Sequence, residues 1–123
     1  MAAPTLALSS VSTRSVGNQK QGTATLTLTS ASSDTYTNGG VTMPTGWKNT
    51  LGCPNSISFH CLSGPLMGST PEVGYLAHID VTNGKLILFG GQADSTTEAL
   101  IELPTSEVIA TGTYSCKIMV QGN

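Results

Sequence analysis

The sequence predicts an all-β protein of one domain, most simply an antiparallel β-sandwich. Threonine and serine make up about a quarter of its 123 residues, and fourteen glycines and six prolines supply turns. This composition favours short strands over helices. A chain of this length can bury one core and is too short for two ordinary domains. The pattern leaves jelly-roll and immunoglobulin-like topologies open and allows at most one short helix.

The single domain is expected to cover residues 1–123 and to include two less regular regions. Residues 1–20 are polar and nearly uncharged, so we expect them to form an extended N-terminal arm. Residues 44–72 are rich in glycine and proline, which predicts long loops around a strand near residues 56–62. No internal repeat of twenty to fifty residues is visible, so one core should serve the whole chain.

The clearest strand covers residues 22–30, where alanine and leucine alternate strictly with threonine. In a strand, this alternation places the two kinds of residue on opposite faces. We expect Ala24, Leu26 and Leu28 to face the core, and the threonines to meet water or a partner without adding charge. The following "SSDTYTNGG" supplies turn residues, and "GGVTM" predicts a short strand that Pro44 ends.

A hairpin is expected in "YLAHIDVTNGKLILF", because Asn83 and Gly84 suit a two-residue type I′ turn. This turn would place Thr82 opposite Lys85. The core face would then carry Tyr75, Ala77, Ile79, Val81, Leu86 and Leu88. The reverse face would carry Leu76, His78, Asp80, Ile87 and Phe89. Because that reverse face is too apolar to meet only water, we expect residues 44–72 or another protein to cover it.

Two further segments, "NSISFHCL" and "TYSCKIMV", alternate with the period of a strand. The expected buried residues are Ile57, Phe59 and Cys61 in the first, and Tyr114, Cys116, Ile118 and Val120 in the second. The segment "DSTTEALIELP" could form the one short helix, with Asp94 or Ser95 as its N-cap. Seven or eight strands with short connections predict a mostly antiparallel order.

Charge and hydropathy argue against several classes of partner. The net charge is −2, and five basic residues give no basic surface for nucleic acid. The longest purely aliphatic and aromatic run, "LILF", is too short to cross a membrane, and the N-terminus lacks the charged region of a signal peptide. Three cysteines, Cys53, Cys61 and Cys116, suit a reducing cytoplasm, most simply as small buried residues, and leave open whether any two pair.

No residue pattern indicates an enzyme, a metal site or a cofactor. His78 and Asp80 lie two residues apart on one expected strand, but the chain lacks the G-x-S-x-G nucleophile motif. The separations among Cys53, His60, Cys61 and His78 match no zinc motif. The acidic residues are dispersed along the chain, which is typical of solvated surface charges.

Three ordered segments resemble small structural proteins of tailed bacteriophages: "SVSTRSVGNQKQGTATLTLTSASSDTYTNGGVTM", "GYLAHIDVTNGKLILFGG" and "TGTYSCKIMVQG". The resemblance covers most of the chain apart from residues 44–73. It implies a capsid decoration, or cement, protein that is made in the host cytoplasm and sits on the outside of an icosahedral head. Its partner would be the major capsid protein. As a homo-oligomer, a dimer or trimer at a symmetry axis, it would tie neighbouring capsomers together.

Three other functions stay open: a phage tail-tube or fibre subunit, a carbohydrate-binding β-sandwich module and, last because the chain lacks a nucleophile motif, a small hydrolase. The binding functions need a rigid surface, which neutral hydroxyls supply without the desolvation cost of buried charges. The candidate interface residues are Pro4, Leu6, Leu8, Arg14, Trp47, Leu76, His78, Ile87 and Phe89. For Trp47 we prefer the alternative that it plugs one end of the core.

Overall fold

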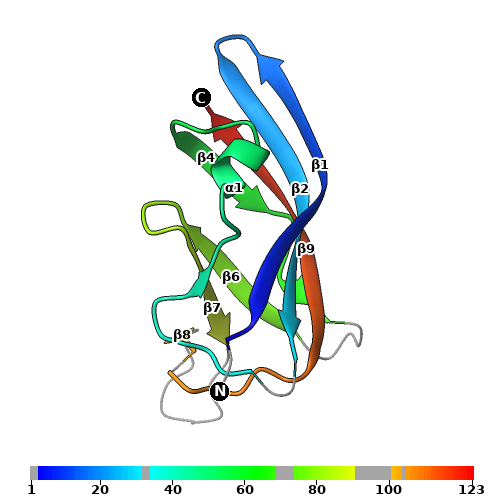
Figure 1. The fold of residues 1–123 in the computed structure, drawn as a ribbon, viewed down its shortest axis with the longest axis vertical. Helices are drawn as coiled ribbons and strands as arrows, with labels where there is room; N and C mark the ends of the chain where they lie inside the picture. The colour runs from blue at the N-terminus through cyan, green and yellow to red at the C-terminus, as the bar shows by residue number, and fades with distance from the viewer. Residues whose placement is uncertain (1–2, 32–33, 69–73, 91–100, 104) are drawn as a thin grey trace.

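One antiparallel sheet, curled into a half-barrel, forms most of the protein in the computed structural model (Figure 1). The structure describes residues 3–31, 34–68, 74–90, 101–103 and 105–123. The elements are β1 (Thr5–Val16), β2 (Gln19–Ser30), β3 (Val41–Thr42), α1 (Trp47–Thr50), β4 (Ile57–Leu62), β5 (Leu66–Met67), β6 (Gly74–Asp80), β7 (Lys85–Gly90), β8 (Ile101–Glu102) and β9 (Gly112–Gly122). Their order in the sheet is β1-β2-β9-β5-β6-β7-β3, with β4 also pairing with β9 and β8 with β7. The all-β prediction is confirmed, and both halves of the curled sheet bury one common core.

Strands β2 and β9 lie together in the sheet and supply much of the core. They pair from Lys20 opposite Gly122 to Ser30 opposite Gly112. The predicted core faces are confirmed, since the buried residues are Ala24, Leu26 and Leu28 in β2 and Tyr114, Cys116, Ile118 and Val120 in β9. Burying one Leu or Ile side chain contributes on the order of 2 kcal/mol. The strict alternation of these two strands therefore stabilises the middle of the sheet.

The residues expected to form an N-terminal arm form an edge strand instead. Strand β1 pairs with β2 from Thr5 opposite Thr29 to Val16 opposite Gln19, with an irregularity between Ser9 and Ser12. Its inward side chains Leu6 and Leu8 pack against the core. The sequence suggested an arm because it is polar, but a polar segment can still satisfy the main-chain groups of a neighbouring strand.

The β6–β7 hairpin has the predicted faces but a different turn. Asp80 pairs with Lys85, so four residues connect the strands instead of the two expected. The Gly84 amide donates a hydrogen bond to the Asp80 carbonyl at 2.8 Å, and the Asn83 amide donates to the Asp80 carboxylate at 3.2 Å. This carboxylate thus stabilises the wider turn. The register differs by two residues, and an even shift leaves each strand residue on its predicted face.

The prediction of which β4 residues are buried is wrong after Ile57. The pairing with β9 is irregular between Ile57 and Phe59. As a result, Phe59 is 48% exposed and Cys61 is exposed, whereas His60 and Leu62 are half-buried. A bulge inserts one residue into a strand, and one extra residue exchanges the two faces.

The region expected to be rich in loops also contains α1, β4 and β5. Trp47 opens α1 and is buried in the core, which confirms the plug interpretation. Leu51 and Cys53, which follow α1, are fully buried and extend the part of the core that Trp47 closes. The helix expected from Asp94 lies outside the described residues, except that residues 101–102 form strand β8.

We expect one of the three cysteines to react with a thiol reagent in the folded protein. Cys61 is exposed, whereas Cys53 and Cys116 are buried, so the expectation of three buried thiols is wrong for Cys61. Burial raises the pKa of both buried thiols, which lowers the amount of reactive thiolate. Spectroscopic titration with a thiol reagent at pH 7.5 should show one thiol per chain that reacts fast. The other two thiols should react only after a denaturant is added. Cys61→Ser should remove the fast phase; three fast equivalents would contradict the burial.

Candidate functional site

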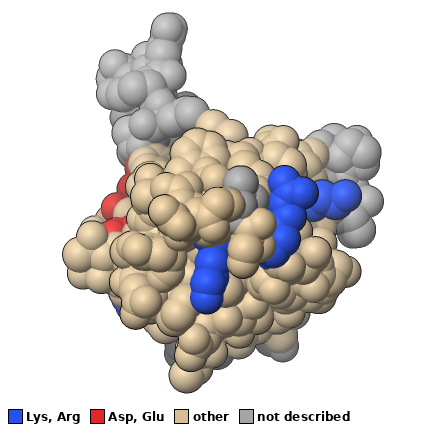
Figure 2. Space-filling view, turned by 90° about the horizontal axis from the view of Figure 1, so that it is seen from above, with Lys and Arg blue, Asp and Glu red and all other residues tan. Residues whose placement is uncertain are grey.

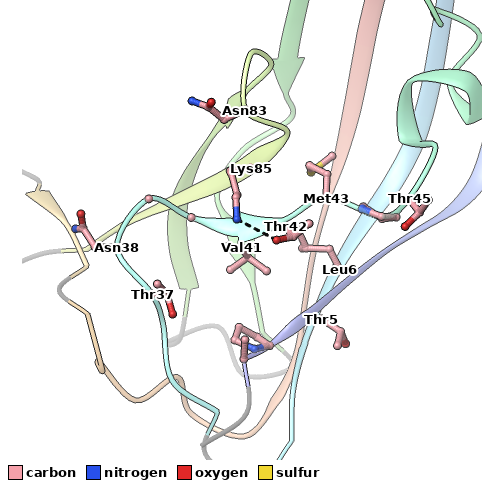
Figure 3. A pocket seen from close by; sticks show the side chains of 15 residues that line it. Thr5, Leu6, Thr37, Asn38, Val41, Thr42, Met43, Thr45, Asn83 and Lys85 are labelled. Carbon is pink, nitrogen blue, oxygen red and sulfur yellow. Dashed lines mark hydrogen bonds between the residues drawn. The ribbon is translucent and has the colours of Figure 1, made fainter.

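A groove of about 740 Å³ lies between the start of β1 and the segment around β3 (Figure 3). Residues 3–6 at the start of β1 form one wall, and residues 37–45 around β3 form the other. Asn83 and Lys85 reach the groove from the β6–β7 hairpin, and Leu6 points from β1 toward β3. The two walls come from segments that are more than thirty residues apart in the chain.

The position of the groove follows from the topology of the sheet. Strands β1 and β3 are the two end strands, so the groove lies where the half-barrel stays open. β3 pairs with β7 through Val41 opposite Leu86 and Thr42 opposite Lys85. An end strand leaves the main-chain N–H and C=O groups of its outer edge unpaired by the sheet. This part of the molecule can therefore bind an extended polypeptide through main-chain hydrogen bonds.

The groove walls are almost neutral. Among the described residues of the lining, Lys85 is the one that carries a charge, and its ammonium donates a hydrogen bond to the Thr42 hydroxyl at 3.1 Å. The polar groups that remain are threonine hydroxyls and asparagine amides. The described lining residues include no carboxylate, histidine or cysteine, so they offer no nucleophile–base pair. The described residues also include no group of three or more ligand-type side chains that could hold a metal ion.

A carboxylate from β8 holds the wall formed by residues 36–39. The Glu102 carboxylate accepts hydrogen bonds from the Tyr36 hydroxyl at 2.7 Å, the Gly39 amide at 2.7 Å and the Asn38 side-chain amide at 3.1 Å. The Tyr36 hydroxyl also accepts a bond from the Leu88 amide at 3.2 Å. Burial, with the hydrogen bond to Glu102, raises the pKa of Tyr36 far above its ordinary value. The sequence suggested that Glu102 was a solvated charge, and the structure shows that it joins β7, β8 and the groove wall.

The Gly39-Gly40 pair allows this wall to lie close to the hairpin. Gly40 has φ 116°, a conformation that favours glycine. A Cβ atom there would lie 2.8 Å from the Leu86 carbonyl oxygen. The turn expected from the asparagine and two glycines is thus placed directly against β7.

The candidate interface residues fall into four places. Pro4 and Leu6 line the groove, although Pro4 is buried and Leu6 also packs against the core. Leu8 packs against the core, and Trp47 is buried in it. Arg14 is exposed near the tip of the β1–β2 hairpin. The remaining four lie together on the outer face of β6 and β7, where Leu76 pairs with Phe89 and His78 with Ile87.

The outer face of β6 and β7 is partly open to solvent. Leu76 is 42% exposed, while Ile87 and Phe89 are half-buried. Strand β4 belongs to the region, residues 44–72, that was expected to cover this face. Its His60 ring lies against the His78 ring of β6, with 5.4 Å between the ring centroids. The outer face is therefore apolar, as predicted. The described residues leave Leu76 partly exposed on it.

We expect the melting temperature to fall by a few degrees when the pH is lowered from 7.5 to 5.5. Burial and the neighbouring His78 hold the pKa of His60 below its ordinary value of 6.5. The unfolded chain therefore binds the proton more readily, so the stability present above pH 6.5 is lost as the pH falls toward the folded-state pKa. Calorimetry should show this, and His60→Gln should reduce the slope. An unchanged slope in that variant would contradict the role of His60.

Comparisons with protein families, curated proteins and solved structures found no match to this chain. No helix in the described ranges is long and apolar enough to cross a membrane. The function is therefore argued from the sequence pattern and from the geometry of the groove.

Proposed function

We propose that this protein is a virion structural protein of a tailed bacteriophage, a decoration protein that binds the outer surface of the head. The observation that carries the proposal is the neutral groove between the two end strands of the half-barrel. Its free strand edges and hydroxyl groups suit a static contact with another polypeptide. The sequence resemblance to small phage structural proteins favours the same class.

In this proposal the partner is the major capsid protein, and the molecule is a non-enzymatic component of the capsid exterior. Many copies around a symmetric particle would each add a modest contact, so rigidity matters more than the affinity of one site. A homo-oligomer at a symmetry axis would multiply these contacts further. The pairing of β2 along all of β9 supplies that rigidity.

Cosedimentation with purified heads that lack the protein tests the proposal. We expect saturable binding, followed by regular density on the outer surface in cryo-electron microscopy. A pair of variants tests the groove: Thr45→Asp places a charge at an exposed position of the groove wall, while Val108→Asp places it outside the groove lining at a residue that is 51% exposed. Binding should be lost in the first variant and retained in the second, provided that both fold by circular dichroism.

Failure to bind heads would contradict the decoration function. Recovery of the protein in purified tails would favour the tail-tube or fibre alternative, and specific retention on a glycan array would favour the carbohydrate-binding alternative.

A further inference from the structure

The basic residues of this acidic chain are unevenly distributed. Three of its five, Arg14, Lys20 and Lys48, belong to the β1–β2 hairpin tip and to α1; we call them the basic end. Arg14 and Lys20 line a hollow of about 280 Å³ together with Gly52, which follows α1. Viewed from that end of the molecule, blue side chains gather near the centre of the surface (Figure 2).

Packing between α1 and the hairpin keeps the basic end together. The Cys53 thiol donates a hydrogen bond to the Lys20 carbonyl at 3.5 Å. A Cβ atom added to Gly52 would lie 3.2 Å from the Thr13 side chain, so the two segments are in close contact. The three charges are therefore held on one rigid unit.

Two side chains of the basic end, those of Arg14 and Lys48, lie against neutral groups. The Arg14 guanidinium donates to the Gln21 side-chain oxygen at 3.5 Å, and the Lys48 ammonium lies 5.8 Å from the centre of the Trp47 ring. Contacts of this kind leave the positive charges available to a partner carboxylate.

By contrast, several carboxylates of the described chain already accept hydrogen bonds from groups of the same chain. Glu102 accepts the three hydrogen bonds given above, and both Asp80 oxygens accept bonds from Asn83. Asp34 is buried and accepts a bond from the Ala31 amide at 3.0 Å. Of the described carboxylates this leaves Glu107, which is exposed, so the described part of a second copy offers the basic end few free carboxylates.

We propose that the basic end docks on an acidic surface of a different polypeptide. This inference rests on the proposed function. It assigns to the basic end a second contact with the capsid shell, beside the contact made by the groove near the start of β1. One molecule would then contact its surroundings at both ends of the half-barrel, as tying neighbouring capsomers together requires. An acidic protein surface suits the basic end better than nucleic acid does, because the whole chain is negatively charged and the neighbouring Trp47 is buried, where it cannot stack on bases.

Two charge reversals of equal size test this inference. Lys20→Glu changes the basic end, and Lys117→Glu changes an exposed lysine on β9 that lies outside it. We expect Lys20→Glu to weaken binding to heads about tenfold at low salt and Lys117→Glu to weaken it by less than about twofold. The difference should vanish near 1 M salt, where charges are screened within about 3 Å. Both variants should keep the wild-type melting temperature.

Immobilised polyglutamate and double-stranded DNA serve as two further probes. Retention on polyglutamate that Lys20→Glu abolishes would support the inference even if the protein failed to bind heads, in which case only the decoration function would fall. Equal effects of the two reversals on head binding would overturn the inference and leave the decoration function standing. Stronger retention on DNA than on polyglutamate would also overturn it, in favour of a nucleic acid.

Discussion

Gly22→Ala should lower the free energy of unfolding by about 3 kcal/mol, the largest loss we expect from adding a single methyl group. Gly22 is buried in β2, where the segment after α1 crosses the strand. A Cβ atom there would clash with the Leu51 carbonyl oxygen and lie 2.8 Å from its carbon. Leu51 is fully buried, so it cannot move away without disturbing the core. Urea denaturation monitored by tryptophan fluorescence would measure the loss.

Gly64→Ala is the matched control for this prediction. A Cβ atom at Gly64 would meet no atom within 4 Å. We expect its free energy of unfolding to stay within about 0.5 kcal/mol of the wild-type value. A wild-type midpoint for Gly22→Ala would show that the segment after α1 does not lie against β2 as described.

Tyr36→Phe should lower the free energy of unfolding by about 2 kcal/mol, since it leaves two partners without their hydrogen bonds. The Leu88 amide would lose its acceptor, and the Glu102 carboxylate would lose its closest side-chain donor. Tyr36 is fully buried, so water cannot easily replace the hydroxyl. Chemical denaturation at neutral pH would measure the change.

Tyr114→Phe provides the comparison, because it removes the same atom from another buried tyrosine. The Tyr114 hydroxyl donates to the Ala110 carbonyl at 2.8 Å, and a neutral hydrogen bond of this kind contributes about 1 kcal/mol. Equal losses in the two variants would contradict the special role of the Tyr36–Glu102 pair.

The sequence predicted β2 and β9 well because their side chains alternate without interruption. It also predicted the faces of β6 and β7, although the turn was wrong, because a shift of two residues preserves them. The face of β4 was missed, since a bulge depends on the strand beside it and leaves no mark in the alternation of β4 itself. Strand β1 was missed because its stability comes from pairing with β2 rather than from apolar residues.

The candidate site was harder to predict than the fold. The groove forms where the two end strands of the sheet approach each other, and the sequence gives no strand order. Glu102 was missed for a similar reason, because its partners at residues 36–39 are more than sixty residues away in the chain. For Trp47 the preferred prediction, a plug at one end of the core, was correct, since a lone Trp among turn residues often covers a core.

The place of β9 in the sheet has a consequence for how the chain folds during synthesis. β9 leaves the ribosome after the other strands of this sheet, yet it lies between β2 on one side and β4 and β5 on the other. Until residues 112–122 emerge, the β1–β2 hairpin can form but has no neighbour along the outer edge of β2. Pairings between distant segments form slowly, and an unpaired strand edge invites aggregation. The nascent chain is therefore most vulnerable just before β9 emerges, and a chaperone that binds extended segments would protect it at that stage.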